Sequence, residues 1–284
     1  MTYQELYIYA NQKLKEALCD QDSVPYEVRC LISDILGIRH YDFPALRTQS
    51  PDKDDESRFI MAVERRAAGV PLQYITGRQI FMGREYDVGE GVLIPRDDTE
   101  VAVRACMSAL GKNDCPKLID LCSGSGIIPI TLAGDYPRAD ITALELYDEA
   151  FCFLQKNIAA HHAANVKPLQ ADVFSAYNRF EDGCFDLIVS NPPYIRSDEL
   201  SNLQTEVQCE PRSALDGGDD GLTFYRAIAE LWLDKLRSGG TVVLEIGEEQ
   251  AQAVSRLLMM NNIVNITVLK DIQDLDRVII GTKK

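Results

Sequence analysis

Features that mark several common classes of protein are missing from this chain of 284 residues. No apolar run is long enough to cross a bilayer, and the amino terminus lacks the patterns of a signal or transit peptide. No two of its eight cysteines form a Cys-x-x-Cys pair, and its three histidines show no metal-ligand or triad spacing. We therefore expect a cytoplasmic protein with reduced thiols, no disulfide framework, no metal site and no contact with membranes.

Positive charge is also scarce. The chain has 29 Lys and Arg against 44 Asp and Glu, a net charge of −15. Proteins that bind nucleic acid normally present a basic face, because neutralising phosphates supplies much of their affinity. The charge therefore argues against direct binding of nucleic acid and favours a basic protein as partner. We expect the chain itself to be a monomer.

The first part of the chain, residues 1–75, is predicted to be a small helical bundle. Thr2 and Glu5 fit a capping box at the start of one helix, and Gly37 can end a second. The acidic stretch at residues 52–56 favours the start of a third helix, since its charges complement the helix dipole. A bundle of this size lies at the lower end of the range of domains.

The rest of the chain divides into a short linker and an α/β domain. Glycines punctuate short extended pieces in residues 76–98, which favours a hairpin linker. From residue 99 to 284 strands alternate with helices, so we predict a doubly wound, Rossmann-like sheet of seven strands whose last two are antiparallel. The predicted strands are residues 117–121, 141–146, 166–170, 185–190, 241–246, 263–269 and 277–281, and the predicted helices are residues 99–110, 148–160, 222–236 and 248–260.

A glycine-bearing turn follows the first of these strands. Its residues are Asp120, Cys122, Ser123, Gly124, Ser125 and Gly126, and glycines in such a turn let the backbone approach a ligand closely. A nicotinamide-dependent oxidoreductase is a rival interpretation. However, Pro129 stands where a dinucleotide fingerprint needs its third glycine, and the carboxylate of Asp120 would repel a pyrophosphate. A nucleoside cofactor without phosphate fits this turn better.

Acidic residues end the next two strands as well. Glu145 lies about twenty residues beyond the glycines, where an acid can bind both hydroxyls of a ribose. Asp172, followed by Val173, ends the third strand and can accept a hydrogen bond from an adenine amine. These acids at successive strand ends of a parallel sheet predict a binding site for S-adenosyl-L-methionine.

The segment Asn191, Pro192, Pro193 and Tyr194 comes directly after the buried strand at residues 185–190. The prolines pin the backbone, so the Asn amide and the Tyr ring are held in a fixed relation. A rigid carboxamide beside an aromatic face suits a flat group that carries an NH₂. The segment therefore indicates methylation of an amide or amino nitrogen.

These motifs together resemble the PrmC/HemK family of glutamine N5-methyltransferases, which act on peptide-chain release factors. The resemblance covers nearly the whole chain through residues 71–77, 93–100, 120–126, 191–194 and 210–218. It implies methyl transfer to the glutamine of a Gly-Gly-Gln motif, with the helical bundle docking the protein substrate. The chain departs from the family at Cys122 and Ser123, where Gly-Thr is common, and at Glu145, where Asp is usual.

Asn191 and Tyr194 allow a mechanism without a strong base. The Asn191 oxygen and the Pro192 carbonyl would accept the two N–H bonds of the target glutamine, and Tyr194 would stack on its amide plane. An adenine-N6 nucleic-acid methyltransferase is the alternative, because it shares the Asn-Pro-Pro-Tyr motif but would need a basic groove. A non-catalytic nucleotide-binding module would not need the rigid carboxamide.

Overall fold

Two compact units make up the computed structural model, which describes all residues 1–284. The first unit contains residues 1–78 together with Gln204–Cys209. The second contains residues 79–203 and 210–284. None of the helices combines the length and the apolar character that crossing a membrane would require.

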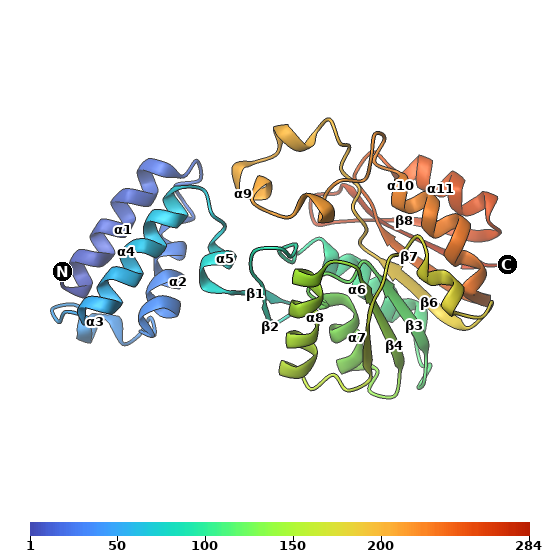
Figure 1. Cartoon of the computed structure of the whole chain (residues 1–284), viewed down its shortest axis with the longest axis horizontal. Helices are drawn as coiled ribbons and strands as arrows, with labels where there is room; N and C mark the ends of the chain where they lie inside the picture. The colour runs from blue at the N-terminus through green and yellow to red at the C-terminus, as the bar shows by residue number, and fades with distance from the viewer. The chain divides into compact units, whose positions relative to one another are not determined.

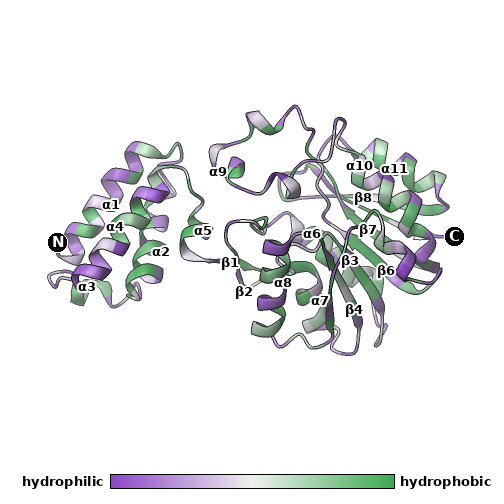
Figure 2. Ribbon diagram, in the orientation of Figure 1, coloured by the Kyte–Doolittle hydropathy of each residue, from purple (hydrophilic) through white to green (hydrophobic).

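The first unit is a bundle of three long helices, α1 (Tyr3–Ala17), α2 (Val24–Leu36) and α4 (Lys53–Ala67), which all contact one another (Figure 1). Thr2 and Glu5 form the predicted capping box, and the Asp52 side chain accepts from the backbone of Asp55 at the start of α4. Each long helix shows hydrophobic and hydrophilic stretches, and the hydrophobic side chains form one core (Figure 2). The short helices are α3 (Phe43–Leu46), α5 (Leu72–Thr76) and α9 (Thr205–Gln208).

A buried arginine links the distant segment Gln204–Cys209 to this bundle. Arg66 is 3% exposed, and its Nε donates to Glu27 at 2.5 Å while its Nη2 donates to Glu206 at 2.6 Å. The predicted α/β domain, residues 99–284, includes residues 204–209, but in the structure these pack within the first unit. This pairing joins residues 140 positions apart, which no local pattern in the sequence reveals.

The second unit contains the predicted α/β fold. Its seven-stranded sheet has the order β5-β4-β3-β6-β7-β9-β8, parallel except at β9. A two-stranded hairpin precedes it, as the glycine-rich linker predicted. The strands are β1 (Arg78–Phe81), β2 (Arg84–Asp87), β3 (Lys117–Leu121), β4 (Asp140–Glu145), β5 (Val166–Gln170), β6 (Phe185–Ser190), β7 (Leu236–Glu245), β8 (Ile263–Lys270) and β9 (Asp276–Lys283).

Helices cover both faces of the sheet. Most agree with the predicted segments, but residues 222–236 form three consecutive short helices rather than one. Residues 248–250 form a turn before α11 because the Gln250 side chain binds the backbone N–H of Gly247. The helices of this unit are α6 (Thr99–Leu110), α7 (Ile127–Asp135), α8 (Asp148–Ala160), η1 (Ala176–Arg179), η2 (Leu200–Asn202), η3 (Arg212–Ala214), α10 (Thr223–Ala227), η4 (Ile228–Trp232), η5 (Leu233–Lys235) and α11 (Ala251–Met260).

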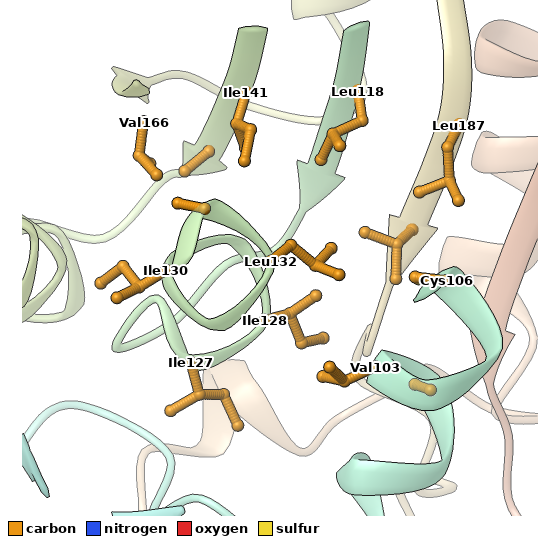
Figure 3. Close-up of a cluster of buried hydrophobic side chains, with 14 of the residues drawn as sticks. Val103, Cys106, Leu118, Ile127, Ile128, Ile130, Leu132, Ile141, Val166 and Leu187 are labelled. Carbon is orange, nitrogen blue, oxygen red and sulfur yellow. The ribbon is translucent and has the colours of Figure 1, made fainter. Parts of the chain in front are cut away.

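Two hydrophobic cores lie on opposite faces of the sheet, because successive side chains of a strand point to opposite faces. Leu118 belongs to the core beneath α6, α7 and α8, while its neighbour Ile119 belongs to the core beneath α10 and α11. Figure 3 shows the first core, in which α7 presents Ile128 and Leu132 to the strands. The rigid sheet between the cores fixes the positions of the loops at its carboxyl edge.

Candidate active site

A cavity of about 260 Å³ opens at the carboxyl ends of β3, β4 and β6. The chain leaves β3 toward β4 on one side, and β6 lies on the other, so this is the point where the strand order reverses. Ligands of doubly wound sheets bind at such a point. Most of the residues proposed from the sequence line the cavity, namely Cys122, Ser123, Gly124, Ser125, Glu145, Asp172, Val173, Asn191 and Pro193.

The glycine turn has the backbone that a close approach to a ligand requires. Cys122, Gly124 and Gly126 all have positive φ, at 63°, 53° and 86°. A Cβ added to Gly126 would come within 2.6 Å of the Leu154 side chain, so this glycine permits packing behind the cavity rather than lining it. Cys122 adopts a conformation that favours glycine, which is the residue common at this position in the family it resembles.

Asp120 lies behind the cavity wall and is not among the lining residues. It is 1% exposed, and neither carboxylate oxygen has a hydrogen-bond partner. Burial raises the pKa of Asp120 to about 8, and the charge of Glu145 adds to the rise. The Ser123 hydroxyl donates to the backbone carbonyl of Asp120 at 3.1 Å. Its role as a ligand of the cofactor stays a prediction.

Glu145 is the most constrained carboxylate of the cavity. Its Oε2 accepts from the backbone N–H of Gly124 at 2.9 Å, and its Oε1 accepts from Leu146 at 2.8 Å and Tyr147 at 3.0 Å. These bonds leave the side chain 6% exposed on the cavity wall. A carboxylate has about four acceptor positions, so further hydroxyl donors can still bind it.

Asp172 is held in a similar way after β5. Its Oδ1 accepts from the backbone N–H of Phe174 at 2.9 Å. Phe174 and Phe224 lie with their ring centroids 5.4 Å apart, and both line the cavity. The cavity therefore combines fixed carboxylates with apolar and aromatic walls, which suits a nucleoside.

The Asn-Pro-Pro-Tyr segment contributes Asn191 and Pro193 to the cavity lining, whereas Pro192 and Tyr194 are not part of it. The Asn191 Nδ2 donates to Thr99 Oγ1 at 3.3 Å. Burial raises the pKa of Tyr194 to about 12, because its ring packs against the hydrophobic core beneath α10 and α11. Stacking of Tyr194 on a substrate remains a prediction.

Glycines hold the following loop against this segment. A Cβ on Gly217 would lie 2.7 Å from the Tyr194 Cα, and one on Gly221 would lie 2.4 Å from the Tyr194 carbonyl oxygen. The Gln250 Nε2 donates to that same carbonyl at 2.9 Å. Gly217 and Gly221 therefore have a packing role.

Several residues that line the cavity were not proposed from the sequence. Arg96 pairs with Glu210 and also lines the cavity. The Glu210 carboxylate accepts in addition from the backbone N–H of Ile94 at 3.0 Å, which anchors the loop before Pro211. Thr99 also lines the cavity. In the sequence, only its position at the start of the predicted helix 99–110 could have indicated that Thr99 belongs to the site.

Comparison with known proteins agrees with this geometry. Residues 90–219 match the model of the methyltransferase small domain, and residues 5–77 match the model of the PrmC N-terminal domain. A release factor glutamine methyltransferase from Thermodesulfovibrio yellowstonii is 38% identical over 90% of this chain and 92% of its own length. One from Moorella thermoacetica is 43% identical over 70% of each chain.

A solved structure extends the likeness to the fold. The catalytic domain of hMettl16, in complex with MAT2A 3'UTR hairpin 1, covers 88% of this chain and 91% of its own with a TM-score of 0.59. Its sequence identity of 14% limits that likeness to the fold. The relative from Thermodesulfovibrio yellowstonii, in contrast, shares sequence over both units of this chain. The chain therefore belongs to the family of release factor glutamine methyltransferases.

Proposed function

We propose that this protein transfers a methyl group from S-adenosyl-L-methionine to the side-chain amide nitrogen N5 of the glutamine in the Gly-Gly-Gln motif of peptide-chain release factors. One observation carries the proposal. Glu145, the last residue of β4, and Asn191, which directly follows β6, line the same cavity at the switch point of the sheet. Asn191 provides an oxygen that can accept the N–H bonds of an amide, and Glu145 provides oxygens that can accept from the hydroxyl groups of a ribose. Two substrates that bind side by side would require both.

The residues of the cavity fit the cofactor. Glu145 would accept the ribose hydroxyls, Asp172 would accept from the adenine amine, and Val173 would contact the adenine ring. The backbone of residues 122–126, with its positive φ angles, would allow close approach of the methionine part. When bound, S-adenosyl-L-methionine supplies an electrophilic methyl group.

The chain's own residues would then orient the target amide. An amide nitrogen is a weak nucleophile because its lone pair is delocalised into the carbonyl. The Asn191 oxygen and the Pro192 carbonyl accept its two N–H bonds, which aims the nitrogen at the methyl group and stabilises the positive charge that develops there. Tyr194 limits the movement of the amide plane. No strong base is needed, because the alkylated nitrogen is acidic.

The first unit is proposed to dock the release factor. Support comes from the match of residues 5–77 to the PrmC N-terminal domain and from the acidic charge of the chain, which suits a basic protein partner. We propose a monomer that acts in the cytoplasm, where release factors work. Its eight free cysteines agree with a reducing compartment.

A methyl-transfer assay with labelled S-adenosyl-L-methionine tests the proposal. Release factor, duplex DNA and free glutamine are offered in parallel, and label is expected only in the release factor. Mass spectrometry should place it on the glutamine of Gly-Gly-Gln. Label in the adenine of DNA, weakening steeply as salt rises, would instead favour a nucleic-acid methyltransferase.

A further inference from the structure

A buried carboxylate outside the cavity lining stands beside the Asn-Pro-Pro-Tyr segment. Glu245 is the last residue of β7, it is 2% exposed, and its Oε2 has no hydrogen-bond partner. A buried, incompletely paired carboxylate costs stability, so such groups commonly serve a site. Glu145 is likewise an acid at the last position of its strand, β4.

The sheet register places Glu245 next to Asn191. β6 pairs with β7 in parallel, with Ser190 opposite Leu244, so the next residues along the two strands are Asn191 and Glu245. Leu244 faces the core beneath α10 and α11, and Val243 faces the core beneath α6. By alternation Glu245 faces α6, whose first residue is Thr99.

A side-chain hydrogen bond connects two of these residues, since the Asn191 Nδ2 donates to Thr99 Oγ1 at 3.3 Å. Burial raises the pKa of Glu245 to about 7, and the nearby polar side chains of Thr99 and Asn191 oppose this rise. The Thr99 hydroxyl therefore accepts from Asn191 and lies close to the Glu245 carboxyl group. Arg277 and Asp98 add opposite charges nearby.

This arrangement determines which end of the Asn191 amide is available to a substrate. A carboxamide can turn over and exchange its oxygen for its NH₂ at little steric cost. With Glu245 and Thr99 behind it, the reversed orientation would set the Asn191 oxygen against a carboxylate oxygen. The NH₂ group therefore stays turned toward Thr99 and Glu245, and the oxygen remains free for a donor in the cavity.

We propose that Glu245, acting through Thr99, is a positioning residue that keeps the Asn191 oxygen directed at the N–H bonds of the target amide. The proposal rests on the proposed function, because it assigns Glu245 a part in that methyl transfer. Glu245 does not touch the cavity itself. Its effect should appear in the chemical step and should depend on the presence of Asn191.

Single-turnover methylation of release factor by Glu245→Gln tests this. We expect the rate to fall by about tenfold to a hundredfold, as loss of alignment does, while cofactor affinity and the KM for release factor change little. In the Asn191→Ala background the same substitution should cause almost no further loss. An equal loss in both backgrounds, or a normal rate in the single variant, would overturn the proposal.

Thr99 offers a matched pair of variants in case Glu245→Gln does not fold. Thr99→Val removes the hydroxyl at constant shape and should slow the reaction like Glu245→Gln, whereas Thr99→Ser should restore most of the rate. Equal rates for the two Thr99 variants would contradict the role of the hydroxyl. If the wild-type protein transfers no methyl to release factor, the proposed function fails. Normal wild-type transfer with unaffected variants overturns only the positioning role.

Discussion

The backbone N–H of Gly124 donates to the Glu145 carboxylate at 2.9 Å, which ties the end of β4 to the glycine turn that follows β3. The two other bonds to Glu145 come from the backbone directly after it. The carboxylate therefore braces the turn and lines the cavity at once. An Asp side chain, usual at this position in the family, is one methylene shorter and would bring its carboxylate less far toward the Gly124 N–H.

Glu145→Ala should weaken the binding of S-adenosyl-L-methionine. The loss should be on the order of 1–3 kcal/mol, the usual cost of leaving hydroxyl groups without partners in a closed site. Glu145→Asp should lose less, because it keeps an acceptor for the ribose. Calorimetric titration measures both. Glu181→Ala, at an exposed acid outside the cavity, is the control. Unchanged affinity in the Glu145→Ala variant would remove this carboxylate from the cofactor site.

Asn191→Ala should fold and bind the cofactor but transfer the methyl group at least roughly a hundredfold more slowly. Loss of one preorganised hydrogen-bonding group that acts in the transition state typically has an effect of this size. Asn191→Asp should keep weak activity through its remaining oxygen, with an added negative charge beside the site. Labelled methyl transfer to release factor gives the rates, and calorimetry checks cofactor binding. Near-normal turnover of the Ala variant would mean that the segment is only a turn.

Much of this architecture could be predicted from local patterns. The capping box at Thr2 and the alternation of strands and helices after residue 99 both predicted elements that the structure contains. The strand-end acids Glu145 and Asp172 are brought to one cavity, since parallel strands present their carboxyl ends at one edge.

Long-range side-chain contacts could not be predicted in this way. The pairing of Arg66 with Glu206 joins residues 140 positions apart, and the contact of Asn191 with Thr99 joins residues 92 positions apart. The packing role of Gly217 also depends on which backbone lies against it. Such contacts depend on the register and packing of the completed fold, which no periodicity within a single segment encodes.

Gly217→Ala should disturb the active site more than an ordinary glycine substitution. The new Cβ would lie 2.7 Å from the Tyr194 Cα, and backbone cannot move aside as a flexible side chain does. We expect the Asn-Pro-Pro-Tyr segment to shift and the methylation rate to fall by about tenfold or more. Gly134→Ala is the control, because its Cβ meets only the flexible end of Arg84. A normal rate in the Gly217 variant would show that the loop adapts freely.

Buried carboxyls should make the stability depend on pH. Burial raises the pKa of Asp120 from 3.8 to about 8 and that of Glu245 from 4.5 to about 7. At a pH between the unfolded and the folded pKa of each group, the folded protein holds a proton that the unfolded chain has lost. The free energy of unfolding should therefore be greatest below the unfolded pKa values and should fall as the pH rises through the folded ones.

Asp120→Asn should flatten this pH dependence, because the amide does not titrate. Urea unfolding at about pH 5.5 and about pH 8.5 should show a smaller difference in the variant than in the wild type, by on the order of a few kcal/mol. Glu181→Gln, at an exposed acid, should leave the difference unchanged. If the Asp120 variant keeps the full pH dependence, the carboxyl is ionised in the folded protein and some donor must reach it.

Removing the residues before about Pro71 should separate binding of the cofactor from recognition of the protein substrate. The seven-stranded sheet has its own cores, so the fragment should stay folded and bind S-adenosyl-L-methionine. It should lose most activity on intact release factor, because binding energy far from the reacting group positions the glutamine. A short Gly-Gly-Gln peptide should be a poor substrate for both forms and less sensitive to the truncation.

The truncation also deprives residues 204–209 of their partners, including the ion pair between Arg66 and Glu206 at 2.6 Å. Glu206→Gln in the full chain provides the control, because it weakens that attachment and leaves the bundle in place. If docking by the bundle explains the loss, this variant should keep most of its activity on release factor. A loss as large as that of the truncation would assign the effect to the segment 204–209 instead. Equal activity of the fragment and the full chain on intact release factor would exclude docking by the bundle.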